Sequence, residues 1–372
     1  MRRLAGFALS AVVTMTMIMA NATVAHANPT ISGSTSGVHG NVWVPNYGTG
    51  SVAEIDPRTM KRVRSIPGTG SHSMVAKMSH DHSKLFVGNF GPLDWSVTVI
   101  DVKSGRVLEK IPTIGAAYAV IQLSADGRRL YVPTALNVVE VIDTDTLALE
   151  RVIPVVLPPG VAHIEVSPDE KYIYSFAAPG ILTRYDAYTG LPVGVPLFLQ
   201  GLFPGWGAQS ADGSLLYSVN YFNGVAIVDA KNWTLRTVTQ LAPLGAGLLS
   251  ATLSPDGKQL WVCNYISDDV RVLDAHTGAQ LRMFKTAGAP VYMGFSDDGK
   301  TGYLTMEDNG APLPLLGPWA SIGATNKLAV YWADLLKLNT HLIKVDTRTF
   351  TKLGEYSEPG AFVAGVFPGS TQ

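Results

Sequence analysis

The sequence predicts an all-β protein, a β-propeller of seven blades, from two regularities of spacing. A short hydrophobic segment that ends in Asp and runs into a polar turn returns about every forty-odd residues. A repeat of this length with room for four strands is typical of a propeller blade. The aspartates that mark it are Asp56, Asp101, Asp143, Asp186, Asp229, Asp274 and Asp346. We expect each of them to cap the turn between the third and fourth strands of a blade rather than to bind a metal.

The second regularity is a Ser-x-Asp-Gly sequence between two β-rich segments of each repeat. It begins at Ser124, Ser210, Ser254 and Ser296, with Glu replacing Gly after Ser167 and a degenerate copy at Ser79. Asp-Gly supplies the residue with positive φ that a tight hairpin needs, so the motif predicts the turn between the first two strands of a blade.

Directly after this turn comes a strand of recurring composition, rich in aromatic and β-branched residues. Its copies are Trp43-Val-Pro-Asn46, Phe86-Val-Gly-Asn89, Tyr131-Val-Pro-Thr134, Tyr217-Ser-Val-Asn220 and Trp261-Val-Cys-Asn264. In this motif the chain resembles the YVTN family of bacterial and archaeal seven-bladed propellers, over nearly all of its length after the N-terminus. The resemblance implies the fold and leaves the function open, because that scaffold has many uses.

The two ends of the repeat predict how the ring closes. Segments around 42–44, 52–55 and 61–66 supply the second to fourth strands of one blade, which has no first strand before them. The lone segment Ala361–Phe367 is expected to be that missing strand, which would leave no open sheet edge. Residues 41–372 are thus predicted to form a single domain.

The N-terminus predicts export. Arg2 and Arg3 precede an uncharged, mostly apolar segment, and Ala25-His26-Ala27 offers small residues for a signal peptidase, so we expect residues 1–27 to be a signal peptide and residues 28–40 an extension. The protein is therefore predicted to be secreted or periplasmic. Cys263 is its only cysteine, which excludes a disulfide within the chain.

Charge and hydropathy limit the partners. The formal net charge is −1, so nucleic acid is not an expected partner. No later apolar segment is long enough to span a bilayer once the signal is removed. We expect a monomer that presents its loop-rich face to a small molecule or to a protein or cell-envelope partner.

One repeat carries a long insertion, residues 307–340, between its second and third strands. Its first half is rich in Gly and Pro, and its second half has the apolar spacing of a helix. Long loops on propellers often carry function, although some are only tolerated insertions.

The innermost strands predict where a site would lie. Counting back from each turn serine, residues two and four positions earlier should face the central channel. The first tier reads Lys77, Gln122, Glu165, Ala208, Thr252, Gly294 and Gly365; the second reads Val75, Val120, His163, Trp206, Ser250, Tyr292 and Val363. Tyr118 and His72 would stand at the mouth above them.

Two functions fit these residues. The first is a binding module, with Trp206, Tyr292, Tyr118, His72, Gln122 and Ser250 lining a small-molecule site. The second is a lactonase-like hydrolase or ring-opening lyase, with His163 as general base or acid, Glu165 as its partner or a second acid, and Lys77 as oxyanion stabiliser. Water-filled channels are common, so Lys77 and Glu165 could equally form a solvated pair.

No cofactor signature is present: the chain lacks a phosphate loop, a nucleophile elbow and a haem-attachment motif. A divalent metal is a further option, with His72, His163 and Glu165 converging on Glu307, Asp308 or His341. The sequence does not decide whether the protein is an enzyme.

Overall fold

The computed structural model describes residues 40–91, 94–117, 120–155, 161–201, 204–220, 224–241, 247–308 and 339–368. The chain divides into two compact units, 1–32 and 33–372, and every described residue belongs to the second. The expected signal peptide and nearly all of the expected extension therefore lie outside the described residues.

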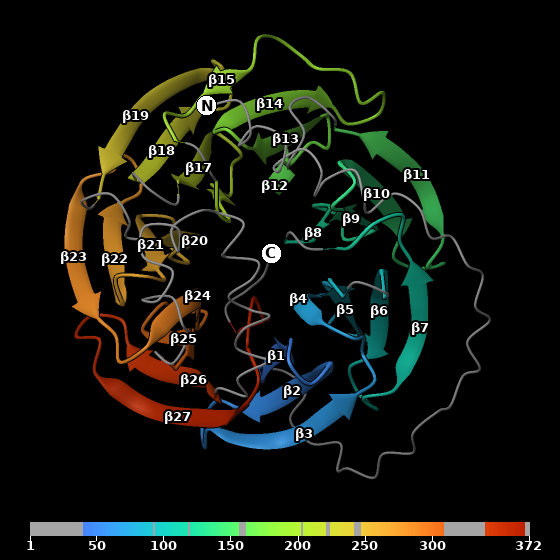
Figure 1. Ribbon diagram of the computed structural model, residues 1–372, viewed down its shortest axis with the longest axis vertical. Helices are drawn as coiled ribbons and strands as arrows, with labels where there is room; N and C mark the ends of the chain where they lie inside the picture. The colour runs from blue at the N-terminus through green and yellow to red at the C-terminus, as the bar shows by residue number, and fades with distance from the viewer. Residues whose placement is uncertain are drawn as a thin grey trace, which may run out of the picture. The chain divides into compact units, whose positions relative to one another are not determined.

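Within the second unit, the described strands form seven antiparallel sheets, one of three strands and six of four. Figure 1 shows them set radially, with β4, β8, β12, β20 and β24 innermost and β3, β7, β11, β19, β23 and β27 outermost. This arrangement confirms the prediction of an all-β, seven-bladed propeller.

We number the blades 1 to 7 in chain order. Blades 1 to 3 are β1 (Val42–Asn46), β2 (Ser51–Asp56) and β3 (Lys61–Pro67); β4 (Ser73–Met78), β5 (Lys84–Asn89), β6 (Ser96–Asp101) and β7 (Val107–Pro112); and β8 (Gln122–Leu123), β9 (Arg129–Pro133), β10 (Val138–Asp143) and β11 (Leu149–Pro154). Blades 4 and 5 are β12 (Val161–Val166), β13 (Tyr172–Ala177), β14 (Ile181–Asp186) and β15 (Leu197–Phe198); and β16 (Ala208–Gln209), β17 (Leu215–Asn220), β18 (Gly224–Asp229) and β19 (Thr234–Gln240). Blades 6 and 7 are β20 (Leu248–Leu253), β21 (Gln259–Asn264), β22 (Asp269–Asp274) and β23 (Gln280–Lys285); and β24 (Ala289–Phe295), β25 (Thr301–Glu307), β26 (Asn339–Asp346) and β27 (Lys352–Pro359).

The C-terminal segment closes the ring, as predicted. Trp43 and Val366 exchange backbone hydrogen bonds of 2.9 and 2.8 Å, and the Tyr47 N–H donates to the carbonyl of Ala361 at 2.8 Å. On its other side the segment reaches blade 2, where the Ala76 N–H donates to the carbonyl of Ala364 at 3.0 Å. Residues 361–367 thus supply the inner strand that blade 1 lacks and also tie blade 1 to blade 2.

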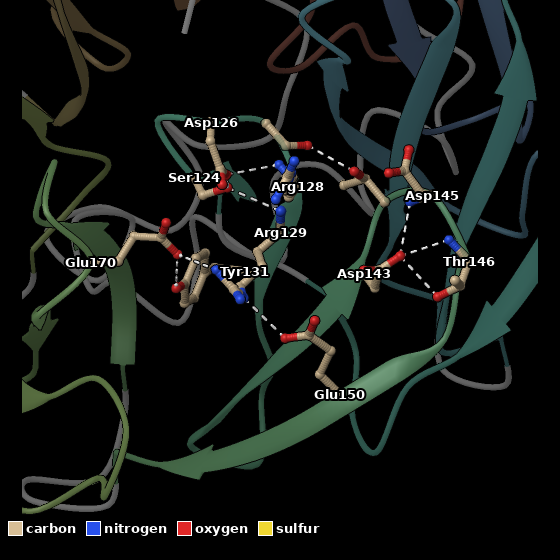
Figure 2. Close-up of polar contacts among 12 residues, drawn as sticks. Ser124, Asp126, Arg128, Arg129, Tyr131, Asp143, Asp145, Thr146, Glu150 and Glu170 are labelled. Carbon is tan, nitrogen blue, oxygen red and sulfur yellow. Dashed lines mark hydrogen bonds and ion pairs between the residues drawn. The ribbon is translucent and has the colours of Figure 1, made fainter.

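The seven repeat aspartates are turn caps, which confirms their predicted structural role. In blade 3, Oδ1 of Asp143 accepts hydrogen bonds from the Thr146 N–H at 2.6 Å and the Thr146 hydroxyl at 2.8 Å (Figure 2). The first of these bonds is the main reason that the pKa of Asp143 lies below its usual value. In every copy the residue four positions after the aspartate has a positive φ: Met60, Gly105, Leu147, Gly190, Trp233, Gly278 and Phe350.

The Ser-x-Asp-Gly turns are equally regular. The Ser124 hydroxyl donates to Asp126 at 2.6 Å and accepts from the Arg129 N–H at 3.0 Å (Figure 2). Gly127 has a φ of 72°, as the motif requires, and in the two variant copies His82 and Glu170 hold the same conformation at 58° and 56°.

Neighbouring blades are joined at this face by polar contacts. Glu170, in the turn of blade 4, accepts from the Tyr131 hydroxyl at 2.7 Å and pairs with Arg129 at 3.4 Å (Figure 2). Arg129 also pairs with Glu150 of its own blade at 3.0 Å. The unusual Glu of the blade 4 motif is therefore used as a contact between blades.

The asparagine that ends the second strand of several blades has a structural explanation. Asn89 is fully buried, and its amide donates to the Thr69 carbonyl at 2.9 Å and to Ser96 and Thr98 at 3.0 Å each. A Cβ on Gly70 would lie 1.9 Å from Asn89 Oδ1, so only glycine fits beside it. The asparagine thereby fixes the loop that enters the blade.

The connection at the expected insertion is slightly shorter than the predicted 307–340, because β25 includes Glu307 and β26 already starts at Asn339. Residues 309–338 lie outside the described part of the chain, so the predicted helix and the role of the insertion stay predictions. In the described ranges, no helix is long and apolar enough to cross a membrane.

Truncation tests the closure. A chain ending after Gly360 loses the hydrogen bonds to Trp43 and Ala76 and the burial of Phe362 and Phe367, which stabilise the ring by about 5 kcal/mol or more. We expect the melting temperature to fall by about 10 °C or more in differential scanning calorimetry. A chain ending after Pro368 keeps these contacts and is the control; equal melting temperatures would contradict the closure.

Candidate functional site

The inner strands bring a group of polar side chains together at the centre of the ring. Lys77 lies on β4, His163 and Glu165 on β12, and Tyr292 on β24. These four residues come from blades 2, 4 and 7, and we call them the channel cluster.

A buried histidine–carboxylate pair is the best defined part of the cluster. His163 Nε2 lies 2.8 Å from Glu165 Oε1, and the two residues are only 1% and 8% exposed. They are two positions apart on one strand, so the alternation of side chains puts both on the same face. Nδ1 of His163 is buried and has no hydrogen-bond partner among the described residues.

Lys77 faces this pair from blade 2. Burial lowers the pKa of its amine to about 8, and the negative charge of Glu165 acts in the opposite direction. The carboxylate therefore offsets only part of the cost of removing the ammonium from water. No hydrogen bond or ion pair of the Lys77 amine is found within the described part of the chain.

Tyr292 completes the cluster from blade 7. Burial raises the pKa of its phenol, with a further increase from the charge of Glu165, so the phenol lies within electrostatic range of the carboxylate. Its ring stacks on Phe367 of the closing segment with centroids 6.1 Å apart. Glu165 is thus the residue that links Lys77, His163 and Tyr292.

Trp206 and Ser250 hold neighbouring inner strands together. The Trp206 N–H donates to the Leu249 carbonyl at 2.8 Å, and its carbonyl accepts from the Ala251 N–H at 2.9 Å. The indole is buried at 7% exposure in the largest apolar core, while the Ser250 hydroxyl is fully buried and donates to the Val291 carbonyl at 2.7 Å. Both residues thus have contacts that stabilise the ring, and their predicted contact with a ligand stays a prediction.

The structure shows contacts of their own for His72 and Gln122, two of the other predicted ligand residues. The His72 ring packs on Tyr47 with centroids 4.5 Å apart, and its Nδ1 lies 3.2 Å from the Ser71 hydroxyl. Gln122 is half-buried on the two-residue strand β8, opposite Tyr131. Tyr118 is not among the described residues.

Other residues named for a metal form a separate group on blade 7. His341 Nε2 lies 2.8 Å from Asp308 Oδ1, and its Nδ1 lies 2.7 Å from Glu355 Oε1. Both ring nitrogens are therefore used by carboxylates on opposite sides. In the described ranges, no three His, Cys, Asp or Glu side chains are placed to hold a metal ion, and metal binding stays a prediction.

Glu307 is a buried carboxyl that the sequence pattern did not single out as a group of its own. It is 2% exposed, and its Oε2 accepts from the Tyr265 hydroxyl at 2.6 Å. Burial raises its pKa to about 7, which the Tyr265 hydrogen bond only partly opposes. The spacing gives no signal for it, because ten positions after the turn serine, where other blades carry Asn89, Asn220 or Asn264, this blade has Met306.

A cavity of about 580 Å³ is lined by the Ser-x-Asp-Gly turns of blades 6 and 7 and by no residue of the channel cluster. Its walls include Asp256, Asp298 and Arg282. The arginine already donates to the carbonyls of Thr347 and Arg348 at 3.2 and 2.9 Å. This cavity is therefore a gap between turn structures whose polar groups are largely used.

Comparison with known proteins supports the fold and does not extend to a family or a function. No family model matches the chain, and no curated protein matches it. Solved propeller-containing structures do. Dihydro-heme d1 dehydrogenase NirN, in complex with DHE, is 14% identical with a TM-score of 0.61, over 93% of this chain and 78% of that one.

Two further structures are similar. A functionally unknown protein from Desulfotomaculum acetoxidans is 13% identical with a TM-score of 0.68, over 88% of this chain and 98% of its own. The β-propeller domain of Myceliophthora thermophila Cps50 (Swd1) is 14% identical with a TM-score of 0.58, over 78% and 87%. At these identities the likeness defines the class of protein, a seven-bladed β-propeller.

The raised pKa of Glu307 predicts how stability depends on pH. The folded protein holds the Glu307 proton up to about pH 7, whereas the unfolded chain releases it near the usual pKa of 4.5. The contribution of Glu307 to the free energy of unfolding is therefore fully present below about pH 4.5. It decreases by up to about 3 kcal/mol as the pH rises to about 7. Glu307→Gln removes this loss, so we expect the variant to gain melting temperature over the wild type at pH 8 and not at pH 4.5.

Glu355→Gln is the control of opposite sign. The Lys352 side chain is the main cause that lowers the pKa of Glu355, so its contribution to stability is present at pH 8 and is lost on acidification. Its replacement should lower the melting temperature at pH 8. Melting curves of both variants at pH 4.5 and 8 test the assignment; a gain for Glu307→Gln that is the same at both would contradict it.

Proposed function

We propose that this protein is an exported binding module that holds a small ligand at the channel cluster. One observation carries the proposal: the buried pair of His163 and Glu165, joined by a hydrogen bond of 2.8 Å, lies within electrostatic range of Lys77 through the charge of Glu165. Ionisable groups gathered in this way, one of them with a lowered pKa, are typical of functional sites.

The scaffold suits such a role. The inner strands are fixed by hydrogen bonds between blades, among them those of Trp206 and Ser250, so the cluster residues are held in place before a ligand arrives. Preorganisation of this kind reduces the entropy lost on binding. A rigid site with few polar groups is the usual form of a small-molecule pocket.

The setting of this function is also proposed from the sequence. The N-terminal segment supports export to the periplasm or beyond, and the strand motif supports membership of the YVTN family. A protein or cell-envelope partner at the loop-rich face is the corresponding partner class, and the protein would act as a monomer.

A thermal-shift screen of the mature protein tests the function. The screen uses metabolite-sized acids, amides, alcohols and sugars, and hits are then measured by titration calorimetry. We expect a ligand whose affinity falls about tenfold or more in Glu165→Gln, because the carboxylate orients His163 and faces Lys77.

Glu150→Gln is the matched control. It removes a carboxylate of the outer strand β11, where Glu150 pairs with Arg129. It should leave the affinity unchanged. Ligands that bind equally well to both variants, or no ligand at all, would contradict a site at the channel cluster.

A second function rests on the same hydrogen bond of 2.8 Å between His163 and Glu165. A histidine oriented by a carboxylate can act as a general base or acid, and the Lys77 amine could stabilise an oxyanion. We propose a lactonase-like hydrolase or ring-opening lyase as the alternative to a pure binding module.

Assays with lactones and with β-eliminable acids decide for or against the alternative. Activity should fall at least about a hundredfold in His163→Ala and in Glu165→Gln if these residues act as acid or base. Activity that survives both changes would exclude the assignment, and so would its absence from the wild type with every substrate.

A further inference from the structure

The outer edge of blade 4 differs from that of the other blades. Its fourth strand, β15, has only 2 residues, which pair with Ile181 and Leu182. The outer strands of the other blades have 6 to 8 residues. Figure 1 shows that the connection from β14 to β15 runs along the outer rim of the ring. We call residues 188–198 the rim segment.

The rim segment carries the most exposed large apolar side chains among the described residues. Its members Tyr188, Leu191, Val195 and Phe198 are between 58% and 78% exposed. The segment is also without charge, since no Asp, Glu, Lys, Arg or His occurs from Ala187 to Ala211. Single exposed apolar residues are ordinary on a protein surface, but a group of them in one short segment indicates a surface that binds an apolar partner.

Contacts with both neighbouring blades hold the rim segment in place. On the side of blade 5, the indole N–H of Trp233 donates to the Val195 carbonyl at 2.7 Å. On the side of blade 3, Gly190 lies so near to Pro154 that a Cβ on the glycine would be 2.8 Å from the proline ring. The backbone of the segment is therefore fixed while its apolar side chains are exposed, which reduces the entropy lost when they bind.

The backbone donors in the first half of the rim segment already have acceptors. From 188 to 193 every N–H donates within the protein, and the two prolines of the segment have no N–H to offer. The acceptors are Asp186 Oδ1 for Tyr188 and Thr189 at 3.1 and 2.7 Å, the Asp186 carbonyl for Gly190 at 2.9 Å, the Thr189 hydroxyl for Leu191 at 3.3 Å and the Arg184 carbonyl for Val193 at 2.7 Å. An apolar phase offers no acceptors, so a segment with few free donors can enter it at low cost.

Two arginines lie beside these apolar side chains. The Arg151 guanidinium of blade 3 stands over the Tyr188 ring, 5.5 Å from its centre. Arg184 donates to the Val193 carbonyl at 3.4 Å. The nearby carboxylate of Asp186 is engaged as the acceptor of its own turn. Apolar side chains together with a tyrosine and arginines suit the interface of a phospholipid bilayer, because the guanidinium groups can bind the phosphates.

We propose that the rim segment docks the protein onto a phospholipid bilayer, with its exposed apolar side chains in the interfacial layer and the two arginines at the level of the phosphates. A second copy of the chain fits less well, because a two-fold contact would bring the arginines of both copies together. The rim segment is separate from the channel cluster, so the inference goes beyond the proposed function. Because the outer rim makes the contact, the ring stands edge-on and the bilayer covers neither end of the channel.

Vesicle flotation of residues 28–372 tests the docking. Residues 1–27 are left out because their apolar segment would bind lipid by itself, and every described strand lies after them. The vesicles are phosphatidylcholine alone and phosphatidylcholine with about one quarter phosphatidylglycerol. We expect the wild type to float with both. The rim variant, Leu191→Ser with Val195→Ser, should bind about tenfold or more weakly, since it loses two exposed apolar side chains.

Leu281→Ser with Met283→Ser is the matched control. Both residues are exposed apolar side chains on the outer strand β23 of blade 6, so this variant loses the same kind of surface elsewhere on the rim. It should bind vesicles like the wild type. Arg151→Gln should bind the vesicles with phosphatidylglycerol about fivefold more weakly, because one cation near the anionic surface is lost.

A fluorescent label gives a second readout that does not depend on the loss of binding. Cys263 is the only cysteine and is buried, so Val195→Cys introduces a single accessible thiol for a polarity-sensitive label. The emission of this label should shift to the blue when vesicles are added. The same label at Leu281→Cys should show no shift.

Each other occupant of the rim segment has its own outcome. A wild type that floats with neither kind of vesicle would overturn the proposal, and so would equal binding by the rim variant and its control. A dimer in analytical ultracentrifugation that the rim variant abolishes, in the absence of vesicle binding, would identify a second copy as the occupant instead. Circular dichroism of both double variants should match the wild type, because all four changes lie at exposed side chains.

Discussion

Seven sheets form one stable ring only because residues far apart in the chain meet in blade 1. The paired hydrogen bonds between Trp43 and Val366 give that blade its inner strand, and the contact of Ala364 with Ala76 passes the connection on to blade 2. Trp43 shares a buried apolar cluster with Val366 of this segment, and Phe362 of the segment is itself fully buried among apolar residues of blades 1 and 7. Because each blade packs on two neighbours, the closing segment supports the geometry of the whole channel.

Sequence reasoning reached most of the fold because the fold is periodic. The Ser-x-Asp-Gly turns and the capping aspartates are local devices whose hydrogen bonds depend on residues two to five positions away, as at Ser124 and Asp143. Such contacts can be read from spacing alone. Counting back from the turn serines also predicted which residues of each inner strand share a face, and hence that His163 and Glu165 lie side by side.

The remaining features depend on contacts between blades, which spacing does not contain. Trp206 and Ser250 face inward by count, yet hydrogen bonds to Leu249 and Val291 engage them in joining inner strands. His341, one of the residues of the metal hypothesis, contacts Asp308 and Glu355 on blade 7. Lys77 and Glu307 likewise interact with residues of other blades, Glu165 and Tyr265.

The closing segment has a consequence for how the protein is made. Its partner Trp43 precedes it by more than 300 residues, so blade 1 stays incomplete until almost the entire described chain has been synthesised. Contacts of such sequence separation form late and slowly, and until then the sheet edges of the first and last blades stay open. The ring therefore closes late in folding, once the blades between Trp43 and Val366 are available to pack on one another.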